Sequence, residues 1–250
     1  HFPDGERYIR ILMDVTGQDV VVIQNTFPDK KIVELLLILQ AVKEAGAKTV
    51  TCVIPYMGYS RQERIFQSGE ARSAKAVAGA IGNMCNRVFT INVHTPDVLQ
   101  FFGCEAKDIN GSREVVRYLK GFKPNMVVAP DEGSKDRCTL AADMLKVPVH
   151  VMKKVRIDGR TVETSSGPVD VKGSTAVILD DIISTGGTIA TAANILRDGG
   201  AARILAACTH GLFIEDAANR LRVCDDILSS DTLEGVYTRF SVAPAIADAL

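Results

Sequence analysis

Short runs of β-branched and aliphatic residues alternate along the chain with longer stretches whose apolar positions recur at helical spacing. The short runs predict strands at residues 20–23, 49–54, 88–93, 126–129, 149–152, 175–179 and 204–208. The longer stretches predict helices at residues 30–45, 74–82, 113–119, 134–145 and 188–197. Alternation of this kind predicts an α/β fold of mainly parallel sheets flanked by helices.

The alternation restarts after residues 121–125, which read as a linker. We therefore expect two α/β domains, an N-terminal domain of residues 1–122 and a C-terminal domain of residues 123–242. Residues 161–172 break the pattern of the second domain, because a Ser-Ser-Gly-Pro stretch separates two short β-branched runs. This segment predicts a hairpin or a flexible flap.

The composition agrees with a globular protein and disfavours several other classes. Of the 250 residues, 46% are hydrophobic and 24% are charged, which is ordinary for a folded domain. The 29 basic and 30 acidic residues give a net charge of −1, so nonspecific nucleic-acid binding is not favoured. No apolar run has the length of a membrane span, and the chain begins without a signal-peptide pattern. None of the six cysteines forms a C-x-x-C pair, which indicates reduced thiols in a cytoplasmic protein.

The most informative segment covers residues 177–189 and reads VILDDIISTGGTI. An apolar strand ends here in two carboxylates, and a turn rich in Ser, Thr and Gly leads into a helix. Such a turn aims backbone N–H groups and hydroxyls at one phosphate, and the positive end of the helix dipole adds to the attraction. The position at the carboxyl end of a parallel strand is also where open α/β sheets bind ligands.

The two carboxylates, Asp180 and Asp181, point to a ligand that is more than a phosphate. Carboxylates repel phosphate but accept hydrogen bonds from sugar hydroxyls. A simple capped helix with two solvated acids is the alternative. The coherence of the whole segment favours a site for a phosphorylated sugar, and the absence of G-x-x-x-x-G-K-[ST] excludes a Walker A loop.

This segment resembles the phosphoribosyl-diphosphate fingerprint of type I phosphoribosyltransferases and ribose-phosphate diphosphokinases. The resemblance implies that Asp180 and Asp181 hold the 2- and 3-hydroxyls of ribose. It also implies that the turn binds the 5-phosphate through Ser184, Thr185, Gly186, Gly187 and Thr188. Many members of these families carry Asp at the position of Ser184, so a charged contact is replaced here by a hydroxyl donor.

Two further blocks resemble the ATP-binding elements of the diphosphokinases alone. The first is Phe2-Pro3-Asp4-Gly5-Glu6, which taken by itself reads as a turn. It resembles the F-x-D-G-E element, which implies that Phe2, Asp4 and Glu6 contact the adenine bound to a neighbouring subunit. The second block, at residues 55–64, resembles P-Y-x-x-x-[AS]-R-Q-[DE]-R, which implies ATP binding by Arg61, Gln62 and Arg64. Taken alone, its arginines suit either a polyphosphate or a solvated loop.

Two strand ends carry candidate metal ligands. His94 follows an apolar strand and resembles the histidine of the family's D-[LI]-H element, which implies a contact to the magnesium of MgATP, with Asn92 in place of the acid. Asp131 lies in a Pro-Asp-x-Gly element and reads either as a helix cap or, by resemblance, as part of the ribose-phosphate and metal site. The resemblance therefore implies Mg²⁺ as the cofactor.

The basic cluster at residues 153–156 resembles the K-x-R of the family's catalytic loop, with Lys154 and Arg156 as the matching pair. A solvated surface cluster is the alternative. Cationic side chains near the β-phosphorus of ATP would supply the charge that diphosphoryl transfer needs.

Taken together, the motifs predict a ribose-phosphate diphosphokinase. By resemblance, it has two phosphoribosyltransferase-like domains, with the C-terminal helix at 243–250 joining the first. Its implied substrates are ATP and ribose 5-phosphate, and it forms a homo-oligomer whose ATP site lies near a subunit interface. The family's first strand has no counterpart before His1, which indicates a trimmed N-terminus. The alternatives are a type I phosphoribosyltransferase, a non-catalytic regulator that senses a sugar phosphate, and a plain nucleotide-binding module.

Overall fold

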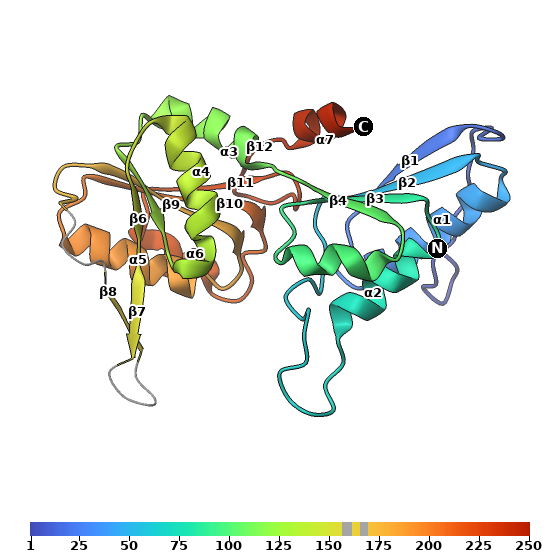
Figure 1. The fold of residues 1–250 in the computed structure, drawn as a ribbon, viewed down its shortest axis with the longest axis horizontal. Coiled ribbons are helices and arrows are strands. Elements are labelled where there is room, and N and C mark those ends of the chain that lie inside the picture. Colours follow the sequence, from blue (N-terminus) through green and yellow to red (C-terminus); the bar gives the residue numbers. More distant parts are fainter. Residues whose placement is uncertain (157–161, 166–169) are drawn as a thin grey trace. The chain divides into compact units, whose positions relative to one another are not determined.

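The computed structural model describes residues 1–156, 162–165 and 170–250, with the backbone alone at 153–156 and 162–165. Residue contacts divide the chain into two compact units, His1–Asn110 and Gly111–Leu250. Figure 1 shows the elements of each unit. Within the described residues, no helix combines the length and the apolar character needed to cross a bilayer.

The first unit is built on a parallel sheet with strand order β1-β2-β3-β4. Its strands are β1 (Asp19–Ile23), β2 (Thr49–Ile54), β3 (Arg87–Ile91) and β4 (Glu105–Ile109). Its helices are α1 (Lys30–Glu44), α2 (Ser73–Gly82) and the 3₁₀ helix η1 (Pro96–Phe102). Leu35 and Leu39 of α1 and Ile81 of α2 are fully buried in one apolar cluster with Cys52 of β2.

A close approach fixes α2 against η1. A Cβ atom placed on Gly82 would lie 1.8 Å from the carbonyl oxygen of Phe102. Only glycine leaves room for the two backbones to meet at this point.

The second unit contains a six-stranded parallel sheet with strand order β12-β11-β10-β9-β5-β6. Its strands are β5 (Met126–Ala129), β6 (Val149–Val151), β9 (Thr175–Ile183), β10 (Arg203–Gly211), β11 (Asp226–Ser230) and β12 (Thr238–Phe240). The helices are α3 (Ser112–Leu119), η2 (Lys120–Phe122), η3 (Glu132–Ser134), α4 (Lys135–Leu145), α5 (Gly187–Asp198), α6 (Ala217–Arg220), η4 (Leu221–Val223) and α7 (Ala243–Ala249). A separate antiparallel pair joins β7 (Lys153–Arg156) to β8 (Val162–Ser165).

Alternation along the strands places apolar side chains on both faces of this sheet. Ile178 of β9 faces the cluster that contains Ile189 and Leu196 of α5. Its neighbour Val177 faces the other cluster, which contains Val115 of α3 and residues of α4. Burial on both faces explains why these strands read as continuous apolar runs in the sequence.

The strand order reverses between β5 and β9. From β5 the chain adds β6 on one side, and from β9 it adds β10, β11 and β12 on the other. The loops that leave the carboxyl ends of β5 and β9 therefore diverge at a topological switch point, the usual ligand site of open α/β sheets.

The division between the units differs from the predicted boundary at residues 122/123. It lies between Asn110 and Gly111, because Val115, Val116 and Leu119 of α3 are buried in the core of the second unit. The predicted linker also packs there, where the ring of Phe122 lies 5.1 Å from the guanidinium of Arg203. The C-terminal helix α7 groups with the second unit and contacts α3, and its expected association with the first domain stays a prediction.

The predicted hairpin or flap at residues 161–172 lies partly outside the described residues. In the described part, β8 is antiparallel to β7, with Lys154 opposite Thr164 and Arg156 opposite Val162. The hairpin thus begins at the basic cluster.

Candidate functional site

The turn between β9 and α5 presents a concentration of unused hydrogen-bond donors. In the described part of the chain, no acceptor binds the backbone N–H groups of Thr185, Gly186, Gly187 or Thr188. The hydroxyls of Ser184, Thr185 and Thr188 are likewise without a partner among the described residues. Gly186 has a φ angle of 75° and precedes the first residue of α5. Consecutive N–H groups around a left-handed residue form a concave anion site, to which the helix dipole adds.

The two carboxylates before the turn are held by α4. Arg137 Nη1 lies 2.9 Å from Asp180 Oδ1 and 3.3 Å from Asp181 Oδ1. Ser134 donates its hydroxyl to Asp180 Oδ1 over 2.7 Å. Each carboxylate also accepts the N–H of the next residue in the chain, at 2.9 Å. The side chains of Asp180 and Asp181 are only 16% and 5% exposed, so these bonds fix their orientation.

Burial and the neighbouring Asp181 carboxylate raise the pKa of Asp180 to about 7. The hydrogen bond from Ser134 and the charge of Arg137 act in the opposite direction and lower that pKa. Asp180 is therefore close to half ionised near neutral pH, where a nearby hydrogen-bond donor or cation favours the ionised form.

Asp131 lies at the carboxyl end of β5, beside this pair. Its Oδ1 accepts the Ser134 N–H over 3.2 Å, so Asp131 does cap the following 3₁₀ helix. The Ser134 hydroxyl oxygen lies 3.2 Å from the same Oδ1. The same Ser134 hydroxyl bonds to Asp180, and Asp131 is thereby brought into the carboxylate cluster. Among the described residues, no group of three or more His, Cys, Asp or Glu side chains is arranged to hold a metal ion.

Lys154 and Arg156 lie on β7, which follows β6 after the single residue Met152. Because β6 pairs with β5 in parallel, β7 leaves from the carboxyl edge of the sheet, the edge that carries Asp131 and the turn between β9 and α5. Figure 1 shows β7 running beyond β6. Its partner β8 contacts α5, the helix that begins at the turn.

In the first unit, the predicted ATP residues follow neighbouring parallel strands. Arg61, Gln62 and Arg64 lie in the loop after β2, and His94 is exposed after β3. The Arg61 guanidinium has no partner in the described part of the chain. The Arg64 guanidinium lies 4.9 Å from the ring of Phe66 and 3.5 Å from the Glu63 carboxylate.

The predicted adenine-binding residues form a turn at the start of the first unit. Phe2 donates its N–H to the Glu6 carbonyl over 2.9 Å, and Glu6 donates its own N–H to Asp4 Oδ1 over 3.0 Å. All three side chains are exposed, and the Phe2 ring meets Tyr8 edge-on with centroids 5.6 Å apart.

Three residues of this site were not predicted: Ser134, Arg137 and Arg220. Ser134 and Arg137 are spaced i, i+3 just after Asp131, a spacing that places both on one helical face and could have suggested a shared role. Arg220 donates Nη1 to the Thr185 carbonyl over 3.0 Å. It lies far from the turn in sequence, and no local pattern marks it.

We expect Gly186→Ala to lower the free energy of unfolding by about 1–2 kcal/mol, the cost of a left-handed conformation for a residue with a Cβ. The new Cβ would also lie 3.0 Å from Cγ of Leu221, so that side chain must shift. Urea denaturation measures the change. Gly121→Ala is the matched control, because a Cβ there meets no atom within 4 Å. Equal stability of the two variants would contradict this account of Gly186.

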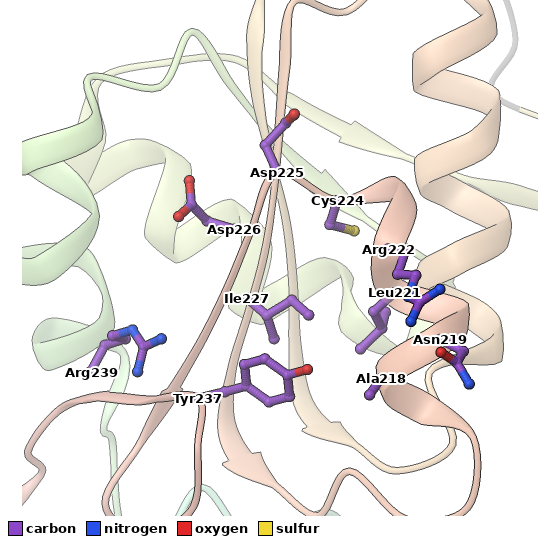
Figure 2. Close-up of a pocket in the computed structure, with 10 residues that line it drawn as sticks. All are labelled: Ala218, Asn219, Leu221, Arg222, Cys224, Asp225, Asp226, Ile227, Tyr237 and Arg239. Atoms are coloured by element: carbon purple, nitrogen blue, oxygen red, sulfur yellow. The ribbon is translucent and has the colours of Figure 1, made fainter.

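A separate cavity of about 430 Å³ lies between the α6–η4 segment and β11, and none of the predicted site residues lines it. Figure 2 shows Leu221 and Arg222 from the α6–η4 segment and Tyr237 from the loop before β12 around this space. Leu221 lines this cavity and also packs against Gly186 in the turn between β9 and α5.

Known proteins resemble this chain over its whole length. Residues 1–84 match the N-terminal domain of ribose phosphate pyrophosphokinase, and residues 108–242 match the phosphoribosyl transferase domain. Ribose-phosphate pyrophosphokinase of Methanopyrus kandleri is 38% identical over 100% of this chain and 88% of its own length. The enzyme of the same name from Methanosarcina mazei is 40% identical, over 100% and 84%. The crystal structure of phosphoribosylpyrophosphate synthetase from Mycobacterium smegmatis has a TM-score of 0.85 at 28% identity, covering 99% of this chain and 86% of that one.

Proposed function

The chain belongs to the ribose-phosphate pyrophosphokinase family, and from this membership we propose how its residues carry out the reaction. The protein transfers the β,γ-diphosphate of ATP to the C1 hydroxyl of ribose 5-phosphate. The products are 5-phosphoribosyl 1-diphosphate and AMP.

One observation supports the proposal that the second unit binds ribose 5-phosphate. Two oriented carboxylates stand directly before a turn whose N–H groups and hydroxyls have no acceptor in the described residues. A ligand that satisfies both parts has vicinal hydroxyls at one end and a phosphate at the other, as ribose 5-phosphate has. A free phosphate would leave the carboxylates repelled, and an unphosphorylated sugar would leave the turn empty.

A motif in the first unit favours a diphosphokinase over a phosphoribosyltransferase. A type I phosphoribosyltransferase has no need of the ATP block at residues 55–64, and that block lies within the N-terminal domain match. A non-catalytic regulator would not need the pair Lys154 and Arg156.

Diphosphoryl transfer depends mainly on the positioning of the two substrates and on the stabilisation of negative charge. Asp180 and Asp181 accept hydrogen bonds from the ribose 2- and 3-hydroxyls, and residues 184–188 hold the 5-phosphate. The C1 oxygen then attacks the β-phosphorus, the bond from that phosphorus to the α-phosphate oxygen breaks, and AMP leaves as the hydroxyl proton is lost. Lys154 and Arg156 stabilise the negative charge that develops on the transferred group.

The donors present fit a magnesium ion that takes most of its ligands from phosphates and water. Mg²⁺ prefers oxygen ligands, and Asp131 offers a carboxylate at the switch point whereas His94 offers one exposed imidazole. We assign Asp131 to the sugar side and His94 to the ATP side. When bound, the ion neutralises phosphate charge and fixes the geometry of the diphosphate.

The exposed Phe2, Asp4 and Glu6 suit contacts with a second copy of the chain, as the resemblance implies. We therefore propose a homo-oligomer in which these side chains reach the adenine of a neighbour. Cytoplasmic location also stays a prediction, and it rests on the six free cysteines.

The first experiment incubates the protein with ATP, ribose 5-phosphate and Mg²⁺ and then separates the nucleotides. We expect AMP only when the sugar is present, in equal amount to 5-phosphoribosyl 1-diphosphate. Asp181→Asn is the control, since AMP made equally by this variant would come from a contaminant. No AMP from a protein that binds both substrates would overturn the diphosphokinase assignment.

A further inference from the structure

Arg220 contacts the turn of residues 184–188 between β9 and α5, which we call the phosphate turn. It is the last residue of α6, and its Nη1 donates to the carbonyl oxygen of Thr185 over 3.0 Å. The bond spans 35 residues of sequence and ties the α6–η4 segment to the loop that leaves β9. Sequence motifs assign no role to this arginine.

The bond determines the direction of the next backbone N–H. The peptide between Thr185 and Gly186 is trans, since the described residues contain a cis bond only at Phe27–Pro28. In a planar trans peptide the carbonyl and the following N–H point in opposite directions. Because Arg220 holds the Thr185 carbonyl, the Gly186 N–H is aimed away from Arg220, and no described residue accepts it.

Leu221, the residue after Arg220, makes a second contact with the Thr185–Gly186 peptide. Leu221 packs so closely on Gly186 that a Cβ there would lie 3.0 Å from Cγ and 3.3 Å from both methyl carbons of Leu221. Leu221 is fully buried, so its side chain occupies the space beside Gly186. The two contacts come from adjacent residues and together hinder rotation of the peptide.

We propose that Arg220 is a positioning residue of the phosphate turn, which fixes the Thr185–Gly186 peptide so that its N–H donates to the 5-phosphate of the sugar. This role rests on the proposed function, because it takes the occupant of the turn to be ribose 5-phosphate. Arg220 acts through the peptide and does not touch the substrate.

The charge of Arg220 is a smaller part of its contribution. The carboxylate of Glu215 lies 3.8 Å from Nη1 and offsets part of the positive charge. Both side chains are also well exposed, at 40% and 63%, so solvent screens the remainder. A directed hydrogen bond to a carbonyl, in contrast, does not depend on net charge.

The test compares Arg220→Met, Arg220→Lys and Arg222→Met. Arg222 is the matched control, because it is an exposed arginine of the same segment that faces the cavity of Figure 2 and makes no bond to the turn. We expect Arg220→Met to raise KM for ribose 5-phosphate about tenfold, the effect of losing one well-aligned bond to a charged ligand. KM for ATP and the melting temperature should stay close to those of the wild type. Lysine can restore a donor at this position and should recover part of the loss.

Calorimetric titration with ribose 5-phosphate alone supplies a readout that does not depend on turnover. The dissociation constant should rise in Arg220→Met by the same factor as KM, and Arg222→Met should bind as the wild type does. Equal affinity of wild type and Arg220→Met would overturn the positioning role, and so would an equal loss in Arg222→Met. A wild type that binds the sugar phosphate but forms no AMP would instead refute the proposed function and leave this inference standing.

Discussion

Replacement of Lys154 by alanine is expected to lower kcat about 100-fold to 1,000-fold, the usual cost of removing one group that stabilises transition-state charge. The binding constants for ATP and ribose 5-phosphate should change far less, because the predicted contacts of both substrates lie in other segments. Lys154 belongs to β7, which leaves the carboxyl edge of the sheet separately from the phosphate turn. Steady-state kinetics with each substrate varied in turn measures the effect.

Lys153→Ala is the matched control for this prediction. It removes the same charge from the adjacent position of β7, and the resemblance assigns no catalytic role to it. A similar loss of kcat in both variants would mean that only the net charge of the strand matters. Normal turnover by Lys154→Ala would show that the catalytic cations lie elsewhere.

Arg137→Met is expected to weaken ribose 5-phosphate binding about 100-fold, in line with ~3 kcal/mol for removing one partner of a largely buried ion pair. Arg137 is the cation that bridges Asp180 and Asp181, and without it these two carboxylates repel each other in a poorly solvated site. Titration calorimetry with ribose 5-phosphate measures the loss. Arg137→Lys should retain part of the affinity, because it keeps the charge but not the planar fork.

Arg137→Met should also change the pH dependence of ribose 5-phosphate binding. The pKa of Asp180 is about 7, and the ionised carboxylate is the form that accepts a hydrogen bond from the sugar. Affinity in the wild type should therefore fall as the pH drops through neutrality. Since Arg137 lowers this pKa, its removal raises it further, and the fall in affinity should begin at higher pH. Lys135→Met removes an exposed cation of α4, the helix that carries Arg137, and this cation is paired with Glu132. This control should leave the pH dependence of ribose 5-phosphate binding unchanged.

Proton linkage predicts the sign of the stability change as well. The folded pKa of Asp180 lies above its ordinary value of 3.8, so the folded protein holds more protons than the unfolded chain between the two values. The contribution of Asp180 to stability is therefore complete at low pH and is lost as the pH rises through this interval. In Arg137→Met the upper end of this pH interval should move to higher pH, because removal of Arg137 raises the folded pKa of Asp180.

Buried strands were the most predictable part of the fold. The structure places β2 and β5 at the predicted residues 49–54 and 126–129, because parallel strands buried on both faces are continuous apolar runs. Three strands at or near the sheet edges were missed: β4, β11 and β12. β4 reads EAKDI and is mostly polar, and β12 has only three residues, so neither gives an apolar run.

The candidate site likewise contains residues that a local sequence pattern indicates and residues that only the fold brings together. The carboxylates and the turn form one contiguous segment, so a local sequence pattern is enough to propose them as a site. Arg137 and Arg220 act on that segment across 43 and 35 residues, so their roles depend on packing that no local pattern encodes. The structure also places the division of the chain before α3, since its apolar face packs on the second unit.

The central position of β9 has a consequence for folding. β9 lies between β10 and β5, and the bond that joins Ser134 to Asp180 closes a loop of 46 residues. The proposed sugar site therefore depends on the pairing of β9 with both neighbours, and we expect it to open only together with the middle of the sheet. A ligand that binds the folded protein at this site stabilises it by mass action, so we expect the free energy of unfolding to rise with the concentration of ribose 5-phosphate.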